Sequence, residues 1–419
     1  MNSHGIRRAF SAVLAVTGCG AIAAGASFAP LGIPPQLTFS QALRLSTGGT
    51  AVVGYAGLTG TDYAFRRTLT DPAIGAGVYT LIEPTSPATS AVANGVSGDG
   101  AVVVGRETAG AAATTAWRWS QADGKQPLGS LAGWTQSFAV CANLDGSIIG
   151  GNASTGSGQR GFRWVNGVLQ QINPVAGFSA ANVTAMSSDG LLLTGYFQAS
   201  SPTDRFQWYQ WTPDGGAVLR PYADGDDYAI ANNANADGSA IVGVGGVWGV
   251  QSGPVFWSDK TGTERLPMLK GWSNGQAHGV SGDGLLVVGS VQIGTTLRAV
   301  LWDRSSGIAH DLNELLPSRG ANLNGFTLEH ARGISDDGTI IAGFGRTPAF
   351  ARDSWVAVLP RSCPGDANGD LLINAADLSV LLSNFGQAAA GPSNGDFNGD
   401  GVCDAADLSV LLSQFGQAC

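Results

Sequence analysis

The stretch SGDGAVVVG at residues 97–105 is one of seven copies of a single pattern, in which a polar turn is followed by an apolar run and a glycine. The other copies are STGGTAVVG (46–54), NLDGSIIGG (143–151), SSDGLLLTG (187–195), NADGSAIVG (235–243), SGDGLLVVG (281–289) and SDDGTIIAG (335–343). Successive copies begin 44 to 54 residues apart. A period of this length indicates an array of one small structural unit.

Two glycines recur in every copy. One follows the turn residue, which is Asp in six copies, and the other lies six positions after the turn residue. The second glycines are Gly54, Gly105, Gly151, Gly195, Gly243, Gly289 and Gly343. Asp-Gly between two apolar runs favours a tight hairpin in which both central residues have positive φ. Each copy is therefore predicted to contain two strands joined by such a turn.

Two further strands are expected in each unit. Segments such as AWRW and VLW follow the hairpin, and in five of the seven units they bring a tryptophan as a packing anchor. These tryptophans are Trp119, Trp164, Trp211, Trp257 and Trp302. A short fourth strand follows, as in KQPLGSL (125–131) and TERLPML (263–269). Four strands in a repeat of 40 to 50 residues predict a β-propeller blade, since solenoid repeats are shorter and need capping ends.

The sequence also predicts how a ring of blades closes. The last unit ends after its third strand, at SWVAVLP (354–360), without a fourth. The segment PLGIPPQLTFSQALRLSTGG (30–49) aligns without a gap with PLGSLAGWTQSFAVCANLDG (127–146). A strand within residues 30–39 is therefore expected to complete the seventh blade. The predicted fold is mainly β, a seven-bladed β-propeller over residues 27–360 followed by a small α-helical module.

Composition and charge agree with a folded, β-rich protein. Hydrophobic residues make up 44% of the chain, which excludes a disordered protein, and Lys and Arg total only 22, which excludes a basic nucleic-acid binder. The repeats resemble the extracellular HAF repeat family, named for a His-Ala-Phe motif that is degraded here to forms such as Tyr63-Ala64-Phe65. The resemblance covers about residues 30–360. It implies export and a repeat fold, and it fixes no reaction.

The C-terminal tail is a duplication of another kind, in which DANGDLLINAADLSVLLSNFGQA (366–388) is followed by DFNGDGVCDAADLSVLLSQFGQA (396–418). Oxygen-bearing side chains fall at loop positions 1, 3, 5, 9 and 12, and a backbone carbonyl is expected at position 7. The first loop supplies Asp366, Asn368, Asp370, Leu372, Asn374 and Asp377, and the second supplies Asp396, Asn398, Asp400, Val402, Asp404 and Asp407. This EF-hand-like spacing predicts two bound Ca²⁺ ions. Seven of the nine net negative charges lie in residues 363–419, which contain no Lys or Arg.

Each loop is expected to open a helix, with Asn374 and Asp404 as N-caps. Apolar residues follow at helical spacing, as Leu378, Leu381, Leu382 and Phe385 and as Leu408, Leu411, Leu412 and Phe415. Residues 363–419 resemble a type I dockerin, including Asp at position 12 of both loops, although Leu371 replaces the turn glycine that the second loop has in Gly401. The resemblance implies docking onto a cohesin through the helices and loop positions 10 and 11. The residues expected to contact the partner are Ala375, Ala376, Leu378, Ala405, Ala406 and Leu408.

The N-terminus predicts export. Arg7 and Arg8 precede an apolar run that ends in a small-residue cleavage site, which makes residues 1–26 a signal peptide rather than a transmembrane anchor. A lipoprotein attached through Cys19 and a twin-arginine signal remain alternatives. In an oxidising compartment, Cys363 and Cys419 are placed to form a disulfide that clasps the ends of the calcium module, whereas Cys403 is expected to be a small buried hydrophobic residue.

No catalytic motif stands out, and no residue is assigned as catalytic. The most unusual residue is His278, at the position five before the turn. This position is held in the other units by Leu43, Asn94, Val140, Thr184, Asn232 and Arg332. Two interpretations are open: a structural position in the strand, which the sequence favours, or a ring that lines one mouth of a central channel. Asp224, Asp226, Asp227, Glu264 and Glu314 are weak candidates for the paired carboxylates of a glycosidase.

Two functions are compatible with these observations. In the first, the protein is a secreted or cell-surface binding or adhesion scaffold without enzymatic activity, docked by its calcium module to a cohesin-like or cell-envelope protein. In the second, it is a polysaccharide-binding component, or an O-glycosyl hydrolase or lyase in polysaccharide catabolism, because dockerins accompany carbohydrate-degrading modules.

Overall fold

The computed structural model describes residues 25–58, 60–110, 113–156, 158–200, 206–359, 365–368, 373–389, 394–398 and 400–416. The predicted signal peptide, Cys363 and Cys419 lie outside these residues. The chain divides into two compact units, one spanning Ala26–Pro360 and the other including Arg361–Cys419.

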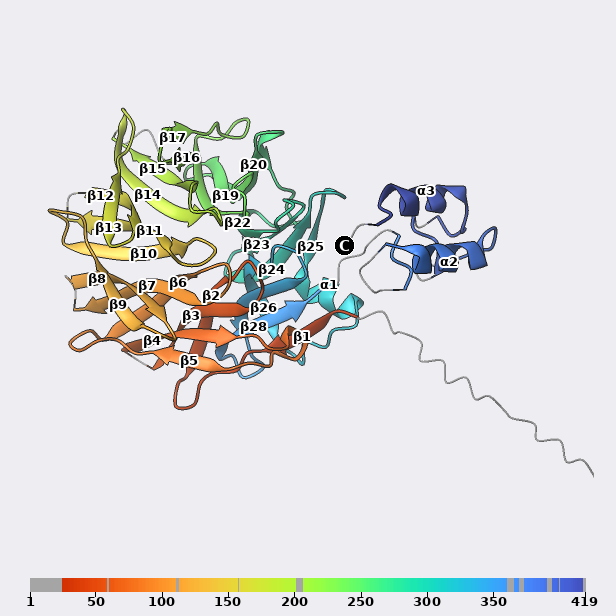
Figure 1. Ribbon diagram of the computed structural model, residues 1–419, viewed down its shortest axis with the longest axis horizontal. Helices are drawn as coiled ribbons and strands as arrows, with labels where there is room; N and C mark the ends of the chain where they lie inside the picture. Colours follow the sequence, from red (N-terminus) through yellow and green to blue (C-terminus); the bar gives the residue numbers. More distant parts are fainter. Residues whose placement is uncertain are drawn as a thin grey trace, which may run out of the picture. The chain divides into compact units, whose positions relative to one another are not determined.

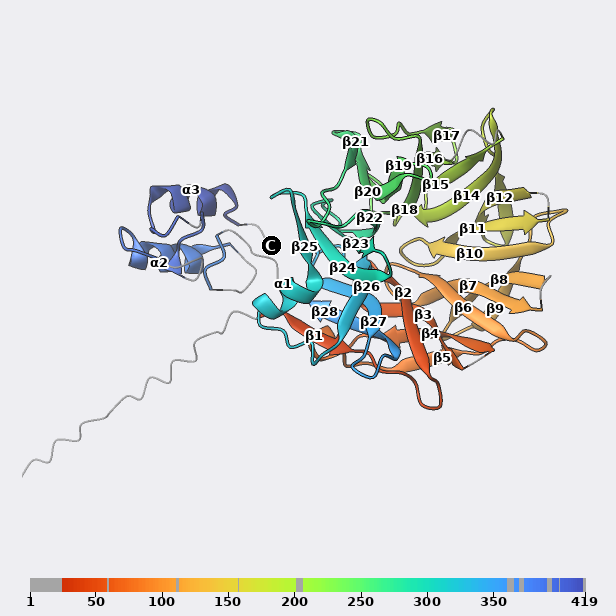
Figure 2. The same ribbon diagram turned by 180° about the vertical axis from the view of Figure 1, so that it is seen from behind.

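The first unit consists of seven groups of four antiparallel strands in the described part of the chain (Figures 1 and 2). Blades 1 and 2 contain β2 (Phe39–Leu45), β3 (Ala51–Leu58), β4 (Thr61–Thr68) and β5 (Tyr79–Ile82), then β6 (Ser90–Val96), β7 (Val102–Ala109), β8 (Ala113–Ser120) and β9 (Gly124–Gly129). Blades 3 and 4 contain β10 (Gln136–Ala142), β11 (Ile148–Thr155), β12 (Gly158–Val165) and β13 (Val168–Ile172), then β14 (Phe178–Met186), β15 (Leu193–Ala199), β16 (Phe206–Thr212) and β17 (Gly216–Leu219).

The remaining blades follow the same plan. Blades 5 and 6 contain β18 (Tyr228–Ala234), β19 (Ala240–Val247), β20 (Gln251–Ser258) and β21 (Gly262–Arg265), then β22 (Asn274–Val280), β23 (Leu286–Ile293), β24 (Thr296–Asp303) and β25 (Ile308–Asp311). Blade 7 contains β26 (Thr327–Ile334), β27 (Ile340–Arg346), β28 (Arg352–Val358) and β1 (Ser27–Pro30). The sequence did not predict the short helix α1 (Leu312–Ser318), which begins at the N-cap Asp311, or the 3₁₀ turn η1 (Pro72–Ile74).

The ring is closed, as the sequence predicted. The first strand of each blade contacts the first strand of the next, and β2 of blade 1 contacts β26 of blade 7. The closing strand is β1, which pairs with β28 and begins three residues before the predicted segment 30–39, so most of that segment is not the closing strand. The predicted alignment itself is correct, because Pro30 lies opposite Trp355 as Pro127 lies opposite Trp117.

The turns differ from the prediction. The glycine after the turn residue has a positive φ in all seven copies, from 69° to 78°, but none of the turn Asp residues does. Each of these glycines donates its N–H to the residue three positions earlier, as Gly100 does to Ser97. The Asp carboxylate instead accepts the N–H two positions later, as Asp99 does from Ala101 at 2.9 Å. An Asx interaction of this kind holds the turn without a positive φ at Asp.

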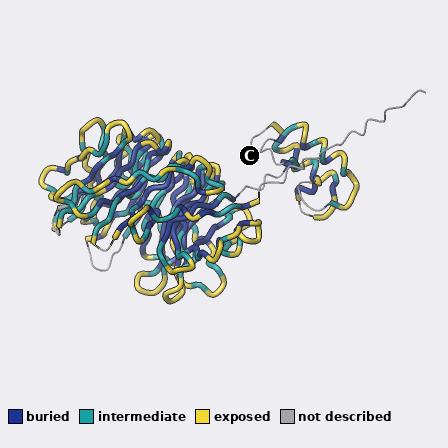
Figure 3. The backbone as a smooth tube through the Cα atoms, turned by 90° about the horizontal axis from the view of Figure 1, so that it is seen from below, coloured by how far each residue is buried: buried dark blue, intermediate teal, exposed yellow. Residues whose placement is uncertain are grey.

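Packing between blades forms the core of the first unit. Buried residues follow the strands, whereas exposed residues follow the turns and connections (Figure 3). Four of the five predicted tryptophan anchors are buried, and Trp164 is half-buried against the guanidinium of Arg118. Backbone hydrogen bonds also join the turns of neighbouring blades, such as Leu144 to Ser188 at 2.8 Å and Asp336 to Thr47 at 2.8 Å.

The second unit contains two helices, α2 (Ala375–Asn384) and α3 (Ala405–Ser413). Asn374 and Asp404 are their N-caps, as predicted, and each helix begins with a capping box. Backbone hydrogen bonds join the two halves in both directions. Gly386 donates its N–H to the carbonyl of Cys403, and Gly416 donates its N–H to the carbonyl of Ile373, both at 2.7 Å. The small core consists of matching residues from both halves: Ala367 and Phe397, Ile373 and Cys403, and Leu381 and Leu411.

Candidate functional site

In the second unit, the carboxylate at loop position 12 joins the two ends of its loop. Asp407 is fully buried and accepts the N–H groups of Phe397 at 2.7 Å, Asn398 at 3.0 Å and Asp404 at 2.9 Å. Asp377 makes the equivalent three bonds in the first loop. Burial alone would raise the pKa of Asp407, but the N–H groups outweigh burial and hold that pKa below its ordinary value. In both loops, one carboxylate therefore joins the two loop ends by accepting three backbone N–H groups.

The other acidic residues of the second loop bond within the loop. Asp396 accepts the N–H of Gly401 at 3.1 Å, and Asp400 accepts the side-chain amide of Asn398 at 2.9 Å. Gly401, at the turn position, has a φ of 89°. Among the described residues, no three His, Cys, Asp or Glu side chains gather closely enough to hold a metal ion as they stand. Asp370 and Leu372 of the first loop lie outside the described residues.

The donor set nevertheless fits a hard divalent cation. Its members are carboxylate, amide and carbonyl oxygens, which Ca²⁺ prefers. Four of the carboxylates are buried, namely those of Asp366, Asp377, Asp396 and Asp407. Residues 363–419 contain no Lys, Arg or His that could offset this charge. A bound cation would supply the missing positive charge.

The surfaces of the two halves match residue by residue. Residues 373–385 and 403–415 have the same sequence of buried, half-buried and exposed positions. The predicted contact residues Ala375, Ala376, Ala405 and Ala406 are exposed, and Leu378 and Leu408 are half-buried. The predicted apolar stripe is divided, because Leu381 and Leu411 are buried while Leu382, Phe385, Leu412 and Phe415 are 44 to 58% exposed. Each half thus presents an exposed Leu-Phe pair, which sequence reasoning placed on one stripe with core residues.

A second candidate site lies at the centre of the propeller. In the first strand of every blade, the pairing register shifts around one residue, which marks a β-bulge. The seven bulge residues are Leu43, Asn94, Val140, Thr184, Asn232, His278 and Arg332. All seven line one pocket of about 490 Å³, so the residues that the sequence places at one repeated position meet around a single pocket. A bulge turns the side chain of its extra residue out of the regular alternation.

The second repeated glycine explains why the bulge recurs. Each of these glycines lies on the second strand opposite the residue before the bulge, as Gly105 lies opposite Ala93. A Cβ at Gly105 would overlap the carbonyl oxygen of Val92 and approach the ring of Trp117 to 2.7 Å. The same overlap with a first-strand carbonyl recurs at all seven glycines. Glycine inside a strand often marks a bulge, so this repeated glycine was the sequence signal for the bulge.

Sequence reasoning missed the arginine that crosses the channel. Arg44 follows the bulge residue of blade 1 and donates to the carbonyls of Thr184 at 3.2 Å, Asn232 at 3.0 Å and His278 at 3.5 Å. These acceptors belong to the bulge residues of blades 4, 5 and 6. Burial lowers the pKa of Arg44 from its ordinary value. A single guanidinium therefore ties four blades together at the base of the pocket.

The bulge residues of the neighbouring blades 6 and 7 also interact with each other. A terminal nitrogen of Arg332 lies 3.4 Å from both ring nitrogens of His278. Burial and then the charge of Arg332 lower the pKa of His278 well below its usual value, so this ring is neutral at pH 7. Burial and then the charge of Arg44 lower the pKa of Arg332 to about 10, so the guanidinium remains a cation.

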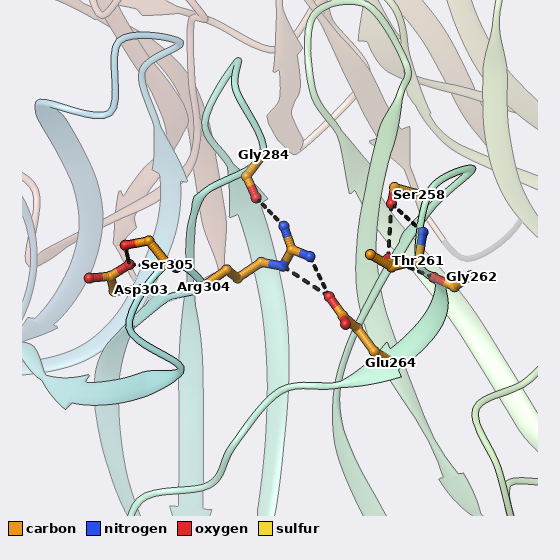
Figure 4. A network of polar contacts seen from close by, with 8 residues as sticks. All are labelled: Ser258, Thr261, Gly262, Glu264, Gly284, Asp303, Arg304 and Ser305. Carbon is orange, nitrogen blue, oxygen red and sulfur yellow. Dashed lines mark hydrogen bonds and ion pairs between the residues drawn. The ribbon is translucent and has the colours of Figure 1, made fainter. Parts of the chain in front are cut away.

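Three of the five acidic residues considered for a glycosidase pair have structural partners. Glu264 of blade 5 forms an ion pair with Arg304 of blade 6, and Arg304 also donates to the carbonyl of Gly284 at 2.8 Å (Figure 4). Asp226 forms an ion pair with Arg265, and Asp227 accepts the N–H of Trp248 at 2.9 Å. Neither Asp224, Asp226, Asp227, Glu264 nor Glu314 lines the 490 Å³ pocket.

The remaining described cysteines have no partner cysteine. Cys403 is buried in the small core of the second unit, as predicted, and donates to the carbonyl of Leu381 at 3.3 Å. Cys141 lies in β10, where burial raises the pKa of its thiol to about 12. None of the helices in the described residues is long and apolar enough to cross a membrane.

Comparison with known proteins identifies the second unit. Residues 364–415 match the family model described as the Dockerin type I domain. The C-terminal unit is therefore a type I dockerin domain, a class of extracellular modules that bind calcium and pair with cohesins. No curated protein matches the chain at a significant level.

Solved structures resemble the first unit in fold. An oligogalacturonate lyase in complex with manganese is 16% identical, with a TM-score of 0.52 over 79% of this chain and 93% of that one. The oligogalacturonate lyase of Vibrio parahaemolyticus is 13% identical, with a TM-score of 0.51 over 81% and 98%. The β-propeller domain of the Trilobed protease from Pyrococcus furiosus is 12% identical, with a TM-score of 0.51 over 77% and 93%. At these identities the likeness shows a propeller fold alone. The resemblance to HAF repeats stays a prediction.

Proposed function

We propose that this protein is a secreted or cell-surface recognition subunit. Its C-terminal module docks, in a calcium-dependent way, onto a cohesin-type partner, and its propeller serves as a rigid binding scaffold. The observation that carries the proposal is the dockerin match together with the two equivalent exposed faces of the module. Export by residues 1–26 and a disulfide between Cys363 and Cys419 belong to the same proposal.

Two Ca²⁺ ions would be held by the twelve predicted ligands, six in each loop. In the second loop, Asn398 and Asp400 would exchange their mutual hydrogen bond for the ion, while Asp407 would keep the loop ends together. The ion would neutralise part of the acidic charge and fix the start of each helix. Folding of such a small module and metal binding are expected to be linked.

The partner would bind the exposed surface of the helices. Leu382 and Phe385 in one half, and Leu412 and Phe415 in the other, offer apolar area beside the exposed alanines at loop positions 10 and 11. Small side chains at those positions let a partner approach the helix backbone closely. Since the two halves match, either half could present the same face after a rotation that exchanges them.

The propeller fits the binding role better than a hydrolytic one. Three of the five acidic residues considered for catalysis have structural partners, and none lines the central pocket. A polysaccharide-binding role is favoured by one specific observation, the polar pocket of about 490 Å³ at the channel mouth. Polysaccharide degradation keeps no support beyond the fold shared with lyase propellers.

The test is binding of a purified type I cohesin by calorimetry, in 2 mM CaCl₂ and in excess chelator. We expect binding in calcium and a loss of at least ~100-fold in chelator. All 11 tryptophans lie in the propeller, so their fluorescence reports the propeller separately from the module and should be unchanged. Binding of equal strength in chelator, or no binding to any of a panel of type I cohesins, would contradict the proposal.

A further inference from the structure

The central pocket carries a concentration of positive charge. Three arginines line it, Arg44, Arg106 and Arg332, and the lining residues include neither Asp nor Glu. None of the three forms an ion pair with another described residue. Asp62 does not line the pocket, but its negative charge favours the charged form of Arg106. Its carboxylate accepts a hydrogen bond from the hydroxyl of Ser90 at 3.1 Å. A pocket with three cations and no lining acid has a positive potential that favours an anion.

One of these cations keeps unused hydrogen-bonding capacity in a buried position. Nε of Arg332 is buried and has no hydrogen-bond partner among the described residues. The other contacts of its guanidinium are the neutral ring of His278 and, at 5.7 Å, the aromatic ring of Phe344. A buried donor without an acceptor costs free energy, and a carboxylate is the ligand that matches a guanidinium with two hydrogen bonds.

The rest of the lining suits hydroxyl groups. Amide side chains reach the pocket from several blades, including those of Asn182 and Gln276, and Tyr196 adds a phenol. Amides offer donors and acceptors side by side, which is what the hydroxyls of a sugar need. The volume of about 490 Å³ lies within the range of about 300–1,000 Å³ that is usual for small-molecule sites.

We propose that this pocket binds an acidic sugar, with the carboxylate against Arg332 and Arg106 and the ring hydroxyls against the amide side chains. Arg44 contributes charge from the base of the pocket, where three backbone carbonyls hold it in place. The proposal deepens the binding role given to the propeller and rests on it. It does not depend on the dockerin module, since none of the lining residues belongs to that module.

The test uses two trisaccharides that differ only at C6, a β-1,4-linked glucuronate trimer and cellotriose. Calorimetry on the full mature chain should show binding of the glucuronate trimer and at least ~10-fold weaker binding of cellotriose. The affinity should be the same in calcium and in chelator. Sodium sulfate and sodium phosphate are measured as competitors, to separate a sugar site from a plain anion site.

Variants locate the site. Arg332→Gln and Arg106→Gln should each weaken the glucuronate trimer by at least ~10-fold, and Arg106 is exposed, so its replacement should leave folding unchanged. Arg163→Gln is the matched control, because Arg163 bonds to the carbonyl of Gly190 and does not line the pocket. Arg332→Lys, which keeps the charge, should restore part of the affinity.

Three results would overturn the proposal. The first is equal binding, or no binding, of the two trisaccharides. The second is equally strong binding of sulfate or phosphate, which would show an anion site without a sugar. The third is an unchanged affinity in Arg106→Gln and Arg332→Gln. Since docking is measured with cohesin and depends on calcium, a failure here and a failure of docking are separate results.

Discussion

The two units of this protein are both made of repeats, but they use repetition in opposite ways. In the propeller, the residues that recur are structural, such as Gly105 and its six counterparts opposite the bulges. The seven bulge residues, which differ from blade to blade, line the pocket. In the dockerin, the recurring residues are the predicted calcium ligands and the exposed Leu-Phe pairs themselves.

The difference shows what each unit requires of its site. The pocket belongs to all seven blades at once, so a mixture of side chains at equivalent positions gives it an asymmetric chemistry. The dockerin has one loop and one helix per site, so a second site needs a second copy of the same residues. Repetition therefore builds one composite pocket in the propeller and two matching surfaces in the dockerin.

The largest expected effect contrasts a structural residue with a pocket residue of the same blade. Gly105→Ala should destabilise the propeller by more than about 3 kcal/mol, because its Cβ would overlap the carbonyl of Val92. Asn94→Ala should cost about 1 kcal/mol, since it loses one hydrogen bond to Ala139. Denaturant unfolding followed by tryptophan fluorescence measures both. Equal costs would show that the division into structural and pocket residues is wrong.

The next prediction concerns the metal. Replacing one acid in each loop, Asp370→Ala with Asp400→Ala, should abolish the calcium-induced gain of helix and reduce cohesin affinity by at least ~100-fold. Circular dichroism during a calcium titration measures the first effect, and calorimetry measures the second. Asp145→Ala, in a propeller turn, is the control and should change neither. A variant that still takes up calcium and gains helix would remove these two residues from the ligand set.

The two dockerin faces predict a smaller effect for damage to one half. Leu382→Ser with Phe385→Ser should weaken cohesin binding about twofold, because the other face remains available and only the statistical advantage of two faces is lost. Changing Leu412 and Phe415 to Ser as well should abolish binding. If the first double variant already abolishes binding, the two faces are not equivalent.

The last prediction is a pH dependence of propeller stability, which involves neither candidate site. Burial, followed by the charges of Arg332 and Arg352, lowers the pKa of His330 to about 3. The unfolded chain, with a histidine pKa of about 6.5, takes up a proton that the folded chain refuses, so stability falls as pH drops below about 6.5 and continues to fall to about pH 3. At pH 5 the loss is about 2 kcal/mol for this residue. His330→Gln should reduce the difference between unfolding at pH 7 and at pH 5, and an unchanged difference would mean that His330 titrates normally.

Much of the propeller could be predicted from its sequence because the same local pattern is present seven times. A single copy predicts a hairpin, and seven copies fix the number of blades and the pairing of Pro30 opposite Trp355. The repeat also identified the seven equivalent residues five positions before each turn, because equivalent residues of a closed ring face the same region. The type of turn did not follow, because Asp-Gly fits two turn geometries and the Asx bond of Asp99 favours the one without a positive φ at Asp.

The pocket chemistry could not be predicted in the same way. Arg44 has no counterpart in the other blades, and its acceptors are carbonyls of residues 140 to 234 positions further along the chain. Arg106 belongs to a second strand and gave no signal of its own in the repeat pattern. Arg44 and Arg106 line the pocket because of the bulges in the first strands and the closure of the ring, and both of these depend on pairing between strands.

The sequence by itself determined the repeat, the blade count and the closure of the ring by the N-terminal segment, and it predicted the oxygen ligands of the dockerin loops, because each depends on spacing along the chain. Only the tertiary structure decided that the variable residues meet in one cationic pocket and that each dockerin half exposes a Leu-Phe pair. The physical reason is that burial and charge at these places depend on neighbours from distant parts of the chain. Spacing along the chain shows which residues occupy equivalent positions in the repeats, and tertiary packing determines which residues surround each of them.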